Sequence, residues 1–478
     1  MSLCNSSDTG PGHQESSLSL VVRDPDKAYV LDNLWLPKKL IAVRAIKEGL
    51  QYWETKQQKS ILRKLWEETE HHIICPREYI KPSQYGQFDF PFIDLTPKEF
   101  PQAGFSVIHD PRDEDQLKAL EALRSSRGGI LNLACGKGKT FLALKHAAEV
   151  GCPLLVVVHN SFLLNQWIGE AIPKHVVLPE GEKVGIIQED QFDWKRPITI
   201  AMIQTLAARF KEGRIPPEFR RYFGMIVYDE VHHLSAPVFV TTASMITGLR
   251  YGLTATEKRT DGYDFIYKYH IGEVFFSDLK QDLIPRIYFQ LTPSFVDITR
   301  PEVRDVRGEL NIGKLRGHVG DMQEANEFRA KCIKEALDSG RKVLCVSHSK
   351  NQLINLHSMF PDSGLIVQET PSKERSKIVR NSKVSFAIAS LGFEGLDDDT
   401  IDTVFVLLPF KAANDLQQVM GRCQRQKEGK KTPVIVIFDD VKIKPLHYMC
   451  STMKNLLKQW DKHVQGMPAL DFSILPAK

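Results

Sequence analysis

The chain has little of what marks a membrane or secreted protein. None of its apolar runs is long enough to cross a bilayer. Its first residues show no basic segment followed by an apolar stretch, which is the pattern of a secretory leader. The eight cysteines are scattered with no CxxC spacing, so neither a disulfide framework nor a zinc site is expected. We therefore expect a cytoplasmic protein whose thiols stay reduced.

An excess of charge of one sign is also lacking. The sequence carries 63 basic and 59 acidic residues, which gives a net charge of +4. Such a balance permits a nucleic-acid partner without indicating one, because local clustering of charge matters more than the sum. The hydrophobic fraction of 42% and the charged fraction of 26% are typical of a globular protein, and 478 residues suggest about three domains.

The N-terminal part divides into a tail and a small domain. Residues 1–17 are rich in Ser, Gly, Asn and Asp and are expected to be a disordered tail. Residues 18–105 are globular in composition and predict a small N-terminal α/β domain. Within it we expect a strand at Ala28–Leu31 and helices over Lys39–Gly49 and Ser60–Glu70.

Beyond this domain, apolar runs alternate with helical patterns, which is typical of parallel sheets covered by helices. The pattern predicts an α/β fold of two doubly wound parallel-sheet lobes in tandem, over residues 106–275 and 322–478, the second with a C-terminal helix. Residues 276–321 form the expected connector between the lobes and hold one candidate strand, Arg286–Leu291. The other candidate strands are Gly129–Leu133, Leu154–Val158, Ile198–Met202, Met225–Tyr228 and Arg250–Leu253 in the first lobe, and Lys342–Val346, Gly364–Val367, Ser385–Ala389, Thr403–Leu408 and Val434–Phe438 in the second.

A glycine-rich loop joins the first strand of the first lobe to a segment with helical spacing. Glycines at such a place let backbone N–H groups face phosphates at a helix N-terminus. Lys139 would reach the β- and γ-phosphates, and Thr140 would ligate Mg²⁺. Because Leu133 stands where the full motif has glycine, a glycine-rich turn without a ligand remains an alternative. The expected nucleotide-binding residues are Cys135, Gly136, Lys137, Gly138, Lys139 and Thr140, with Gln116 as a candidate reader of the adenine edge.

A second motif, Asp229-Glu230-Val231-His232, follows a buried strand of the same lobe. Carboxylates at the carboxyl end of such a strand lie at the edge where ligands bind. Asp229 would hold Mg²⁺ and Glu230 would polarise the attacking water. His232 would link this site to the other lobe, and the hydroxyls of Thr254 and Thr256 could hydrogen-bond the motif or merely cap a helix.

The second lobe carries arginines at helical spacing. Gln418, Arg422 and Arg425 share one helix face. The guanidinium fork suits a γ-phosphate, although a basic helix facing solvent is the alternative. Asp397 could touch the ribose, support the arginines, or serve only as a turn residue. If the two lobes enclose one nucleotide, its hydrolysis would couple to lobe movement.

In this order the motifs resemble those of superfamily 2 helicases of the DExH type, across residues 104–440. Residues 133–140, 160–167 and 229–233 resemble the branch that holds XPB-like repair helicases and phage UvsW-type branch-migration helicases. Residues 65–68 and 75–78 are similar to the leader domain of some phage members, which suggests a T5-like phage helicase. The resemblance implies RecA-like lobes, ATP and Mg²⁺ as cofactors, and catalytic roles for Lys139, Glu230, Gln418, Arg422 and Arg425.

The resemblance also implies nucleic-acid contacts along the edges of both sheets. Family members grip backbone phosphates with hydroxyls, amides and basic groups, so sequence preference is slight. Each candidate here could equally be a helix cap or a loop residue. The candidates are Asn160, Ser161, Gln204, Thr205, Ser347, His348 and Ser390, with a basic leading domain (Lys38, Lys39, Arg44, Lys47, Lys56, Lys59, Arg63 and Lys64) that could contact DNA or simply be solvated.

Taken together, the resemblance implies an ATP-dependent DNA helicase or translocase that remodels forks or Holliday junctions in phage recombination, repair or replication. Residues 18–105 would choose the branched substrate, and the host cytoplasm would be its location. Glu394 stands where many RNA-type DEAD-box members have Arg, which favours DNA over RNA. Two alternatives stay open: a DExH RNA helicase, and an ATP-gated motor or scaffold subunit that does not unwind.

Overall fold

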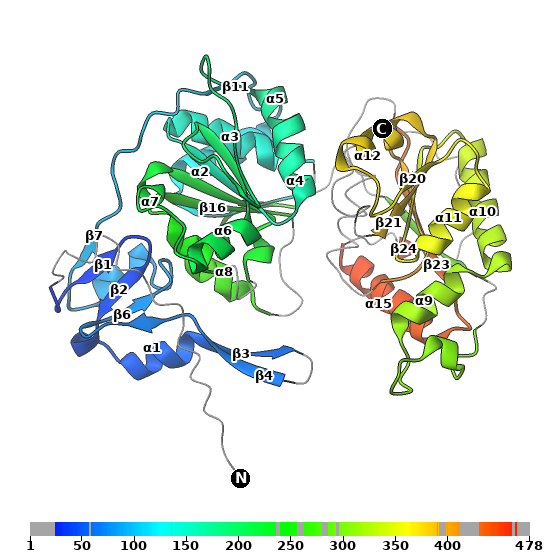
Figure 1. Ribbon diagram of the computed structural model, residues 1–478, viewed down its shortest axis with the longest axis horizontal. Coiled ribbons are helices and arrows are strands. Elements are labelled where there is room, and N and C mark those ends of the chain that lie inside the picture. The colour runs from blue at the N-terminus through cyan, green and yellow to red at the C-terminus, as the bar shows by residue number, and fades with distance from the viewer. Residues whose placement is uncertain are drawn as a thin grey trace, which may run out of the picture. The chain divides into compact units, whose positions relative to one another are not determined.

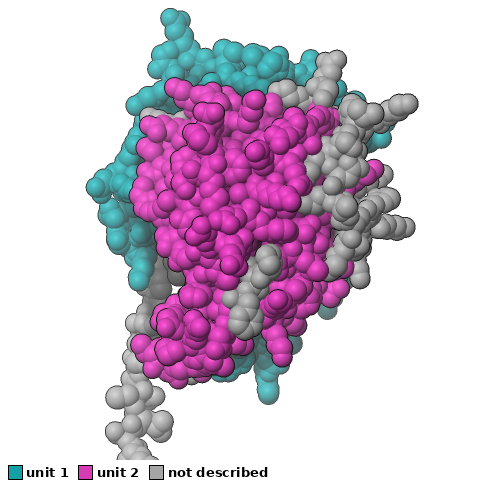
Figure 2. Space-filling view, turned by 90° about the vertical axis from the view of Figure 1, so that its right-hand side faces the viewer, with its two compact units in different colours: residues 1–133, 138–278 teal, residues 134–137, 279–478 magenta. Residues whose placement is uncertain are grey.

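The computed structural model describes residues 24–56, 59–134, 136–235, 240–255, 262–279, 285–292, 296–389, 391, 398, 400–410, 430–460 and 464–465. The expected tail at residues 1–17 lies outside them. The chain forms two compact units, residues 1–133 with 138–278 and residues 134–137 with 279–478, which Figure 2 colours separately. The N-terminal domain and the first lobe, apart from residues 134–137, belong to the first unit, and the second lobe belongs to the second.

The N-terminal domain is built on a mixed five-stranded sheet in the order β5-β6-β2-β1-β7. Its buried apolar residues, among them Leu34, Leu36 and Ile73, form a core of their own. The predicted strand at Ala28–Leu31 is confirmed as β1, and the predicted helix over Lys39–Gly49 is shorter than expected. The elements are β1 (Ala28–Val30), β2 (Leu34–Pro37), a 3-10 turn (Lys38–Leu40), α1 (Val43–Gly49), β5 (Glu67–Glu68), β6 (His72–Cys75), a 3-10 turn (Pro82–Gln87) and β7 (Phe92–Asp94).

The helix predicted over Ser60–Glu70 is wrong, because this segment is half of a β-hairpin. Strand β3 (Gln51–Lys56) pairs antiparallel with β4 (Lys59–Lys64), and Trp53 lies opposite Leu62. Residues 51–64 are rich in aromatic and β-branched side chains, which fit a pleated surface. Pairing between strands thus outweighs the weaker helical spacing of 60–70.

The first lobe is an eight-stranded sheet in the order β13-β12-β14-β10-β15-β16-β9-β17. All neighbouring pairs are parallel except β12 with β13. The five strands predicted for this lobe are confirmed. The strands are β9 (Gly129–Leu133), β10 (Leu154–Val158), β12 (Gly185–Gln188), β13 (Gln191–Phe192), β14 (Ile198–Met202), β15 (Met225–Asp229), β16 (Leu249–Thr254) and β17 (Val274–Asp278), beside a small pair of β8 (Ser106–Val107) and β11 (Val176–Val177).

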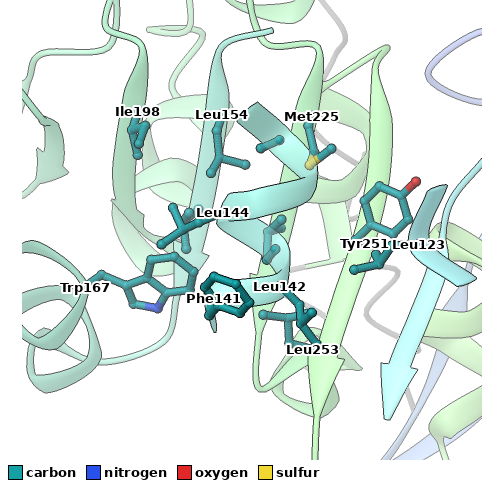
Figure 3. Packing of buried hydrophobic residues seen from close by; sticks show 14 of the residues in the cluster. Leu123, Phe141, Leu142, Leu144, Leu154, Trp167, Ile198, Met225, Tyr251 and Leu253 are labelled. Atoms are coloured by element: carbon teal, nitrogen blue, oxygen red, sulfur yellow. The ribbon is translucent and has the colours of Figure 1, made fainter. Parts of the chain in front are cut away.

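Helices cover both faces of this sheet (Figure 1), and their buried residues form two apolar clusters. Figure 3 shows Phe141, Leu142 and Leu144 of α3 packed toward strand residues such as Leu154 and Leu253. Because both faces are buried, the central strands are apolar throughout. The helices are α2 (Glu114–Ser125), α3 (Lys139–Val150), α4 (Ser161–Gln166), a π-helix (Trp167–Ala171), α5 (Ile172–His175), α6 (Ile203–Lys211), α7 (Phe219–Tyr222), the 3-10 segments η4 (Val231–Ser235) and η5 (Val240–Met245), and α8 (Asp264–Ile271).

The second lobe is a parallel sheet of seven strands in the order β20-β21-β19-β22-β23-β18-β24. Its five predicted strands are confirmed, and β18, expected in the connector, pairs with β23. The predicted fold class, two parallel-sheet RecA-like lobes, is therefore confirmed. The elements are β18 (Arg286–Leu291), a 3-10 turn (Pro301–Val303), α9 (Ile312–Gly320), α10 (Gln323–Asp338), β19 (Val343–Ser347), α11 (Lys350–Ser358), β20 (Gly364–Ile366), α12 (Ser372–Asn381), β21 (Val384–Ile388), β22 (Thr403–Val406), β23 (Val434–Asp439), α15 (Lys444–Trp460) and β24 (Val464–Gln465).

Buried arginines join the N-terminal domain to the first lobe. The guanidinium of Arg250, which is 0% exposed, donates to the carbonyl oxygen of Asp32 at 2.5 Å and to that of Ile246 at 2.8 Å. Arg220 pairs with the Asp32 carboxylate at 2.6 Å, and Arg77 donates to the carbonyl of Gly248 at 2.9 Å. Since a buried charge is costly unless its donors are satisfied, these bonds fix the two parts to each other.

Among the helices that the structure describes, none combines the length and the apolar character needed to span a membrane.

Candidate functional site

The loop between β9 and α3 has the backbone geometry of a phosphate loop. Gly136 and Gly138 have φ angles of 82° and 87°, a region that side chains other than glycine rarely adopt. Gly138 is also the residue that precedes α3, a helix of 12 residues. The first N–H groups of such a helix have no partner within the helix, so this end can receive an anion.

The ammonium of Lys139 points back along this loop. Its Nζ donates to the carbonyl oxygen of Leu133, the last residue of β9, at 2.7 Å. A phosphate bound at the start of α3 would compete with that carbonyl for the ammonium. Thr140 is half-buried in the first turn of the same helix, and Lys137 is buried.

Gln116 lies directly against the phosphate loop. A Cβ atom added to Gly138 would stand 2.3 Å from Nε2 of Gln116, so the glutamine amide occupies the space that any side chain there would need. Gln116 is 5% exposed, and its Oε1 accepts from the backbone N–H of Arg112 at 3.0 Å. The structure brings Gln116 to the expected site, and its contact with adenine remains a prediction.

Asp229 is the last residue of β15 and is held by two donors. The indole N–H of Trp167 donates to Oδ2 at 2.9 Å, and the backbone N–H of Glu230 donates to Oδ1 at 3.1 Å. Burial and the neighbouring Glu230 raise the pKa of Asp229, whereas the Trp167 bond and the charge of Lys139 lower it. When a desolvated carboxyl group lies beside a second carboxylate, a bound cation stabilises its ionised form, so such a pair favours cation binding.

The residue types around Asp229 fit Mg²⁺. Over the described ranges no group of three or more His, Cys, Asp or Glu could hold a metal by itself. Magnesium is ordinarily bound through one or two carboxylates together with phosphate oxygens of the substrate. Thr140 and Asp229 would therefore be enough to hold the ion beside a bound triphosphate.

Trp167 is a residue that our sequence reasoning missed. It begins the π-helix Trp167–Ala171, where the extra residue per turn sets its buried indole toward Asp229. The one signal in the sequence was a tryptophan within the motif at 160–167, since a buried indole N–H usually needs an acceptor.

Glu230 and His232 form a buried cluster with Thr254. Glu230 has φ of 49°, an uncommon conformation for a residue with a side chain. Nδ1 of His232 lies 3.6 Å from Oε2 of Glu230 and 3.5 Å from Oγ1 of Thr254. The ends of β15 and β16 are thus connected through one imidazole, which agrees with the contact considered for Thr254. The expected link of His232 to the other lobe remains a prediction.

Comparison with known proteins agrees with this geometry. The ResIII family, described as the type III restriction enzyme res subunit, matches residues 55–259. The chain is 27% identical over 358 residues to a protein of Escherichia phage T5 named as a helicase, covering 72% of this chain and 73% of that one. It is 37% identical over 153 residues to the DNA 3'-5' helicase XPB of Mycobacterium tuberculosis, covering 32% and 27%. The chain is a superfamily 2 helicase.

Other similarities concern this helicase's relatives and its fold. It is 25% identical over 391 residues to a protein of Acanthamoeba polyphaga mimivirus named as an ATP-dependent RNA helicase, covering 79% of this chain and 72% of that one. The structure of Saccharomyces cerevisiae Dbp5 bound to RNA and ADP BeF3 superposes with a TM-score of 0.52 at 12% identity, covering 74% and 88%. The helicase relatives support ATP hydrolysis by this chain, whereas the likeness to Dbp5 at 12% identity concerns the fold alone.

Several predicted site residues of the helicase lie outside the described residues. They remain predictions, and they include the arginine-bearing half of the expected ATP site. They are Cys135, Thr256, Ser390, Asp397, Gln418, Arg422 and Arg425.

The four first-lobe candidates for nucleic-acid contact lie after β10 and β14, which are adjacent parallel strands. Asn160 caps α4 by accepting from the N–H of Leu163 at 2.8 Å, and Ser161 accepts from Gln188 at 3.3 Å. Gln204 and Thr205 are also bonded within the lobe, to the carbonyl of His159 at 2.7 Å and to the N–H of Glu189 at 3.1 Å. The side chains of Ser161 and Gln204 are exposed at this edge.

The second-lobe candidates differ from each other. Ser347 is 1% exposed; its hydroxyl donates to Gln352 at 2.6 Å and accepts from the N–H of Ser349 at 3.0 Å. These two bonds join it to the start of α11, and its contact with nucleic acid remains a prediction. His348 is exposed at the same strand end.

Proposed function

We propose that this helicase is an ATP-dependent DNA helicase or translocase that remodels branched DNA, such as forks and Holliday junctions. Recombination, repair or replication of a phage would be its setting. The observation that carries the motor part is the cluster of Asp229, Glu230 and His232 beside the phosphate loop. DNA as substrate is supported by the similarity to an XPB named as a DNA helicase, and by Glu394, where RNA-type relatives often have arginine.

In the proposed ATP step, the phosphates lie at the N-terminus of α3 and Lys139 leaves Leu133 to bind them. Thr140 and Asp229 would hold Mg²⁺, which would supply positive charge to neutralise the phosphates. Glu230 orients the attacking water and accepts its proton. His232 then senses the state of Glu230 and transmits it to Thr254.

The domains have separate proposed roles. Residues 106–275 bind ATP, residues 276–321 connect the lobes, and residues 322–478 supply Arg422 and Arg425 to close the site. Residues 18–105 select branched substrate. Alternate gripping of phosphates by the two lobes, through the strand-end residues described above, would move the helicase along the nucleic acid.

The test is ATP turnover with single strands, plain duplexes, forks and four-way junctions, each made of DNA and of RNA. We expect branched DNA to stimulate turnover most. The Lys139→Ala variant should show no turnover with any of them while its circular dichroism is unchanged. Turnover that is independent of nucleic acid would contradict the proposal.

A second candidate is an RNA helicase, favoured by the similarity to the mimivirus protein, which covers 79% of this chain. Stronger stimulation by RNA than by matched DNA would select it. Stimulated turnover without displacement of a strand or of a triplex-forming oligonucleotide would instead indicate a motor or scaffold subunit that does not unwind.

A further inference from the structure

The β3–β4 hairpin exposes an unusual amount of apolar surface. Figure 1 shows it as a ribbon apart from the five-stranded sheet of the N-terminal domain. Trp53, Ile61 and Leu62 are 61%, 44% and 36% exposed. Of the tryptophans whose side chains the structure describes, the other four are buried or half-buried.

One face of the hairpin presents an aromatic ring beside a cation. Trp53 pairs with Leu62, and two positions toward the open end Gln51 pairs with Lys64. Because side chains alternate along a strand, Trp53, Leu62 and Lys64 lie on the same face. This face therefore combines a flat apolar ring, an aliphatic support and the side chain of Lys64, which is exposed and whose ammonium lies 5.0 Å from the centroid of the Trp66 ring.

The opposite face fixes the hairpin to the first lobe. Tyr52 is 9% exposed, and its ring centroid lies 5.1 Å from that of Tyr263 and 5.9 Å from that of Phe265. The hydroxyl of Tyr263 donates to the carbonyl of Trp53 at 2.8 Å. The ring of Trp53 is thus held on a rigid support, which lowers the entropy lost when a ligand binds it.

The support itself leads to the ATP site. Phe265 belongs to α8, and α8 packs against η4, the segment that carries His232. A shift of η4 during hydrolysis would therefore reach the base of the hairpin through a single helix.

The charge of the hairpin favours a polyanion over an apolar protein partner. Residues 51–64 contain four basic residues and one acidic residue, Glu54. That carboxylate is paired with Arg63 at 2.9 Å, so it does not repel phosphates. A basic surface with an exposed aromatic ring is the combination that binds unpaired nucleotides, because every base has a face that can stack.

From these observations we infer that the hairpin is a base-stacking wedge. The Trp53 ring stacks on the first unpaired base at the junction between duplex and single strand, and Lys64 contacts the adjoining phosphate. This inference rests on the proposed function and deepens it, since it names the group that distinguishes a branch from a plain duplex.

The test compares binding of a forked DNA and of a blunt duplex of the same length, without ATP. For Trp53→Ala we expect the Kd for the fork to rise by about 5- to 150-fold, the range that stacking of one base supplies. The Kd for the blunt duplex should change by less than about twofold. Trp53→Phe, which keeps an aromatic face, should retain most of the affinity. The matched control is Tyr448→Ala, which removes an aromatic ring that is 71% exposed on α15.

A fluorescent 2-aminopurine placed at the junction gives a second readout. Stacking on Trp53 should change its emission in the wild-type complex and leave it unchanged with Trp53→Ala, while Leu62→Asn should give an intermediate result. If Trp53→Ala lost the same affinity for the fork and for the blunt duplex, the wedge would be rejected in favour of DNA binding that does not distinguish a branch. Unchanged binding by Trp53→Ala would overturn it in favour of a surface for a protein partner.

The two hypotheses fail separately. Fork binding that depends on Trp53, together with ATP turnover that no nucleic acid stimulates, would reject the proposed motor and leave the wedge standing. ATP turnover that nucleic acid stimulates, together with fork binding that does not depend on Trp53, would reject the wedge and leave the proposed motor standing.

Discussion

Glu230 combines a strained backbone with a chemically useful place. At φ of 49° a residue with a side chain costs on the order of 1 kcal/mol relative to ordinary conformations. Such strain persists where the surroundings impose it, and it is concentrated at functional sites. Here it turns the Glu230 carboxylate toward His232 while the preceding residue stays in the sheet.

Replacing Glu230 by Gln should therefore separate binding from chemistry. The amide keeps the size of the side chain but cannot accept the proton of the attacking water, so we expect ATP affinity to change little and kcat to fall by about 10²–10⁴-fold. Single-turnover hydrolysis and titration with a fluorescent ATP analogue measure the two. Glu212→Gln, an exposed change in the same lobe, is the control; near-normal hydrolysis by Glu230→Gln would exclude it as the base.

His146 makes stability depend on pH. It lies in α3 with Nε2 3.2 Å from the Tyr251 hydroxyl, and burial lowers its pKa to about 4. The unfolded chain binds a proton near pH 6.5 and the folded one does not, so this contribution is complete above about pH 6.5 and is lost as pH falls toward about 4.

We expect the free energy of unfolding to fall by about 2 kcal/mol between about pH 7.5 and about pH 5 because of His146 alone. The His146→Gln variant, which has no titrating ring, should lose about 2 kcal/mol less over the same interval. Urea unfolding of the helicase at the two pH values measures this, with the exposed His71→Gln as control. If the wild type, His146→Gln and His71→Gln all lost the same free energy of unfolding, His146 would not be the source of the pH dependence.

For single residues, the sequence predicted positions that follow from the local order of strand, loop and helix. The phosphate loop, Asp229, Glu230 and His232 follow buried strands directly, so their placement depends on local order alone. Trp167 could not be found in this way, because its bond to Asp229 depends on a π-helix and on 62 residues of intervening fold.

Among the elements, the π-helix at Trp167–Ala171 has a measurable role. Substituting Phe for Trp167 keeps the apolar ring and removes the N–H that holds Asp229. Loss of a group that orients a metal ligand commonly costs about 10–100-fold in metal affinity. We therefore expect the Mg²⁺ concentration for half-maximal ATP turnover to rise by about that factor, with a smaller change in kcat at saturating Mg²⁺.

The control for this change is Trp194→Phe, a second buried tryptophan of the same lobe that packs on Phe219 instead. An unaltered Mg²⁺ dependence in Trp167→Phe would show that the indole serves packing alone.

Element prediction succeeded where burial alone sets the pattern. Strands such as Leu154–Val158 are apolar on both sides because helices cover both faces, so their limits could be taken directly from the sequence. The hairpin was missed because β4 is mostly exposed, so burial imposes no two-residue alternation on its sequence. Its conformation depends on Tyr52 meeting Tyr263, a contact between distant parts of the sequence.

For the whole molecule, the decisive expectation concerns the second lobe. If Arg422 and Arg425 complete the ATP site, removing either guanidinium should lower kcat by about 10³–10⁵-fold with little change in ATP affinity. Steady-state ATPase assays of Arg422→Ala and Arg425→Ala measure this. Lys427→Ala is the control. At helical spacing Lys427 falls on a different face from Arg422 and Arg425, so removing its positive charge should leave kcat unchanged.

The division into two lobes could be predicted because each repeats the alternation of strand and helix. The N-terminal boundary of the second lobe could not be predicted, because β18 lies before the expected boundary in the sequence and joins the sheet of this lobe by pairing with β23. Neither could the attachment of the leading domain, because Asp32 and Arg250 are separated by 218 residues.

The guanidinium of Arg250 has a consequence for how such proteins diversify. One of its three carbonyl acceptors, that of Asp32, comes from the leading domain, and an unsatisfied buried donor costs about 1–3 kcal/mol or more when it is charged, an appreciable fraction of a domain's stability. A genetic exchange that gave this motor a foreign leader would need a compensating substitution at position 250 in the same step. We therefore expect leader and motor to be exchanged together. If the hairpin selects the substrate as proposed, its preference would change more readily by substitutions on the hairpin than by exchange of the whole domain.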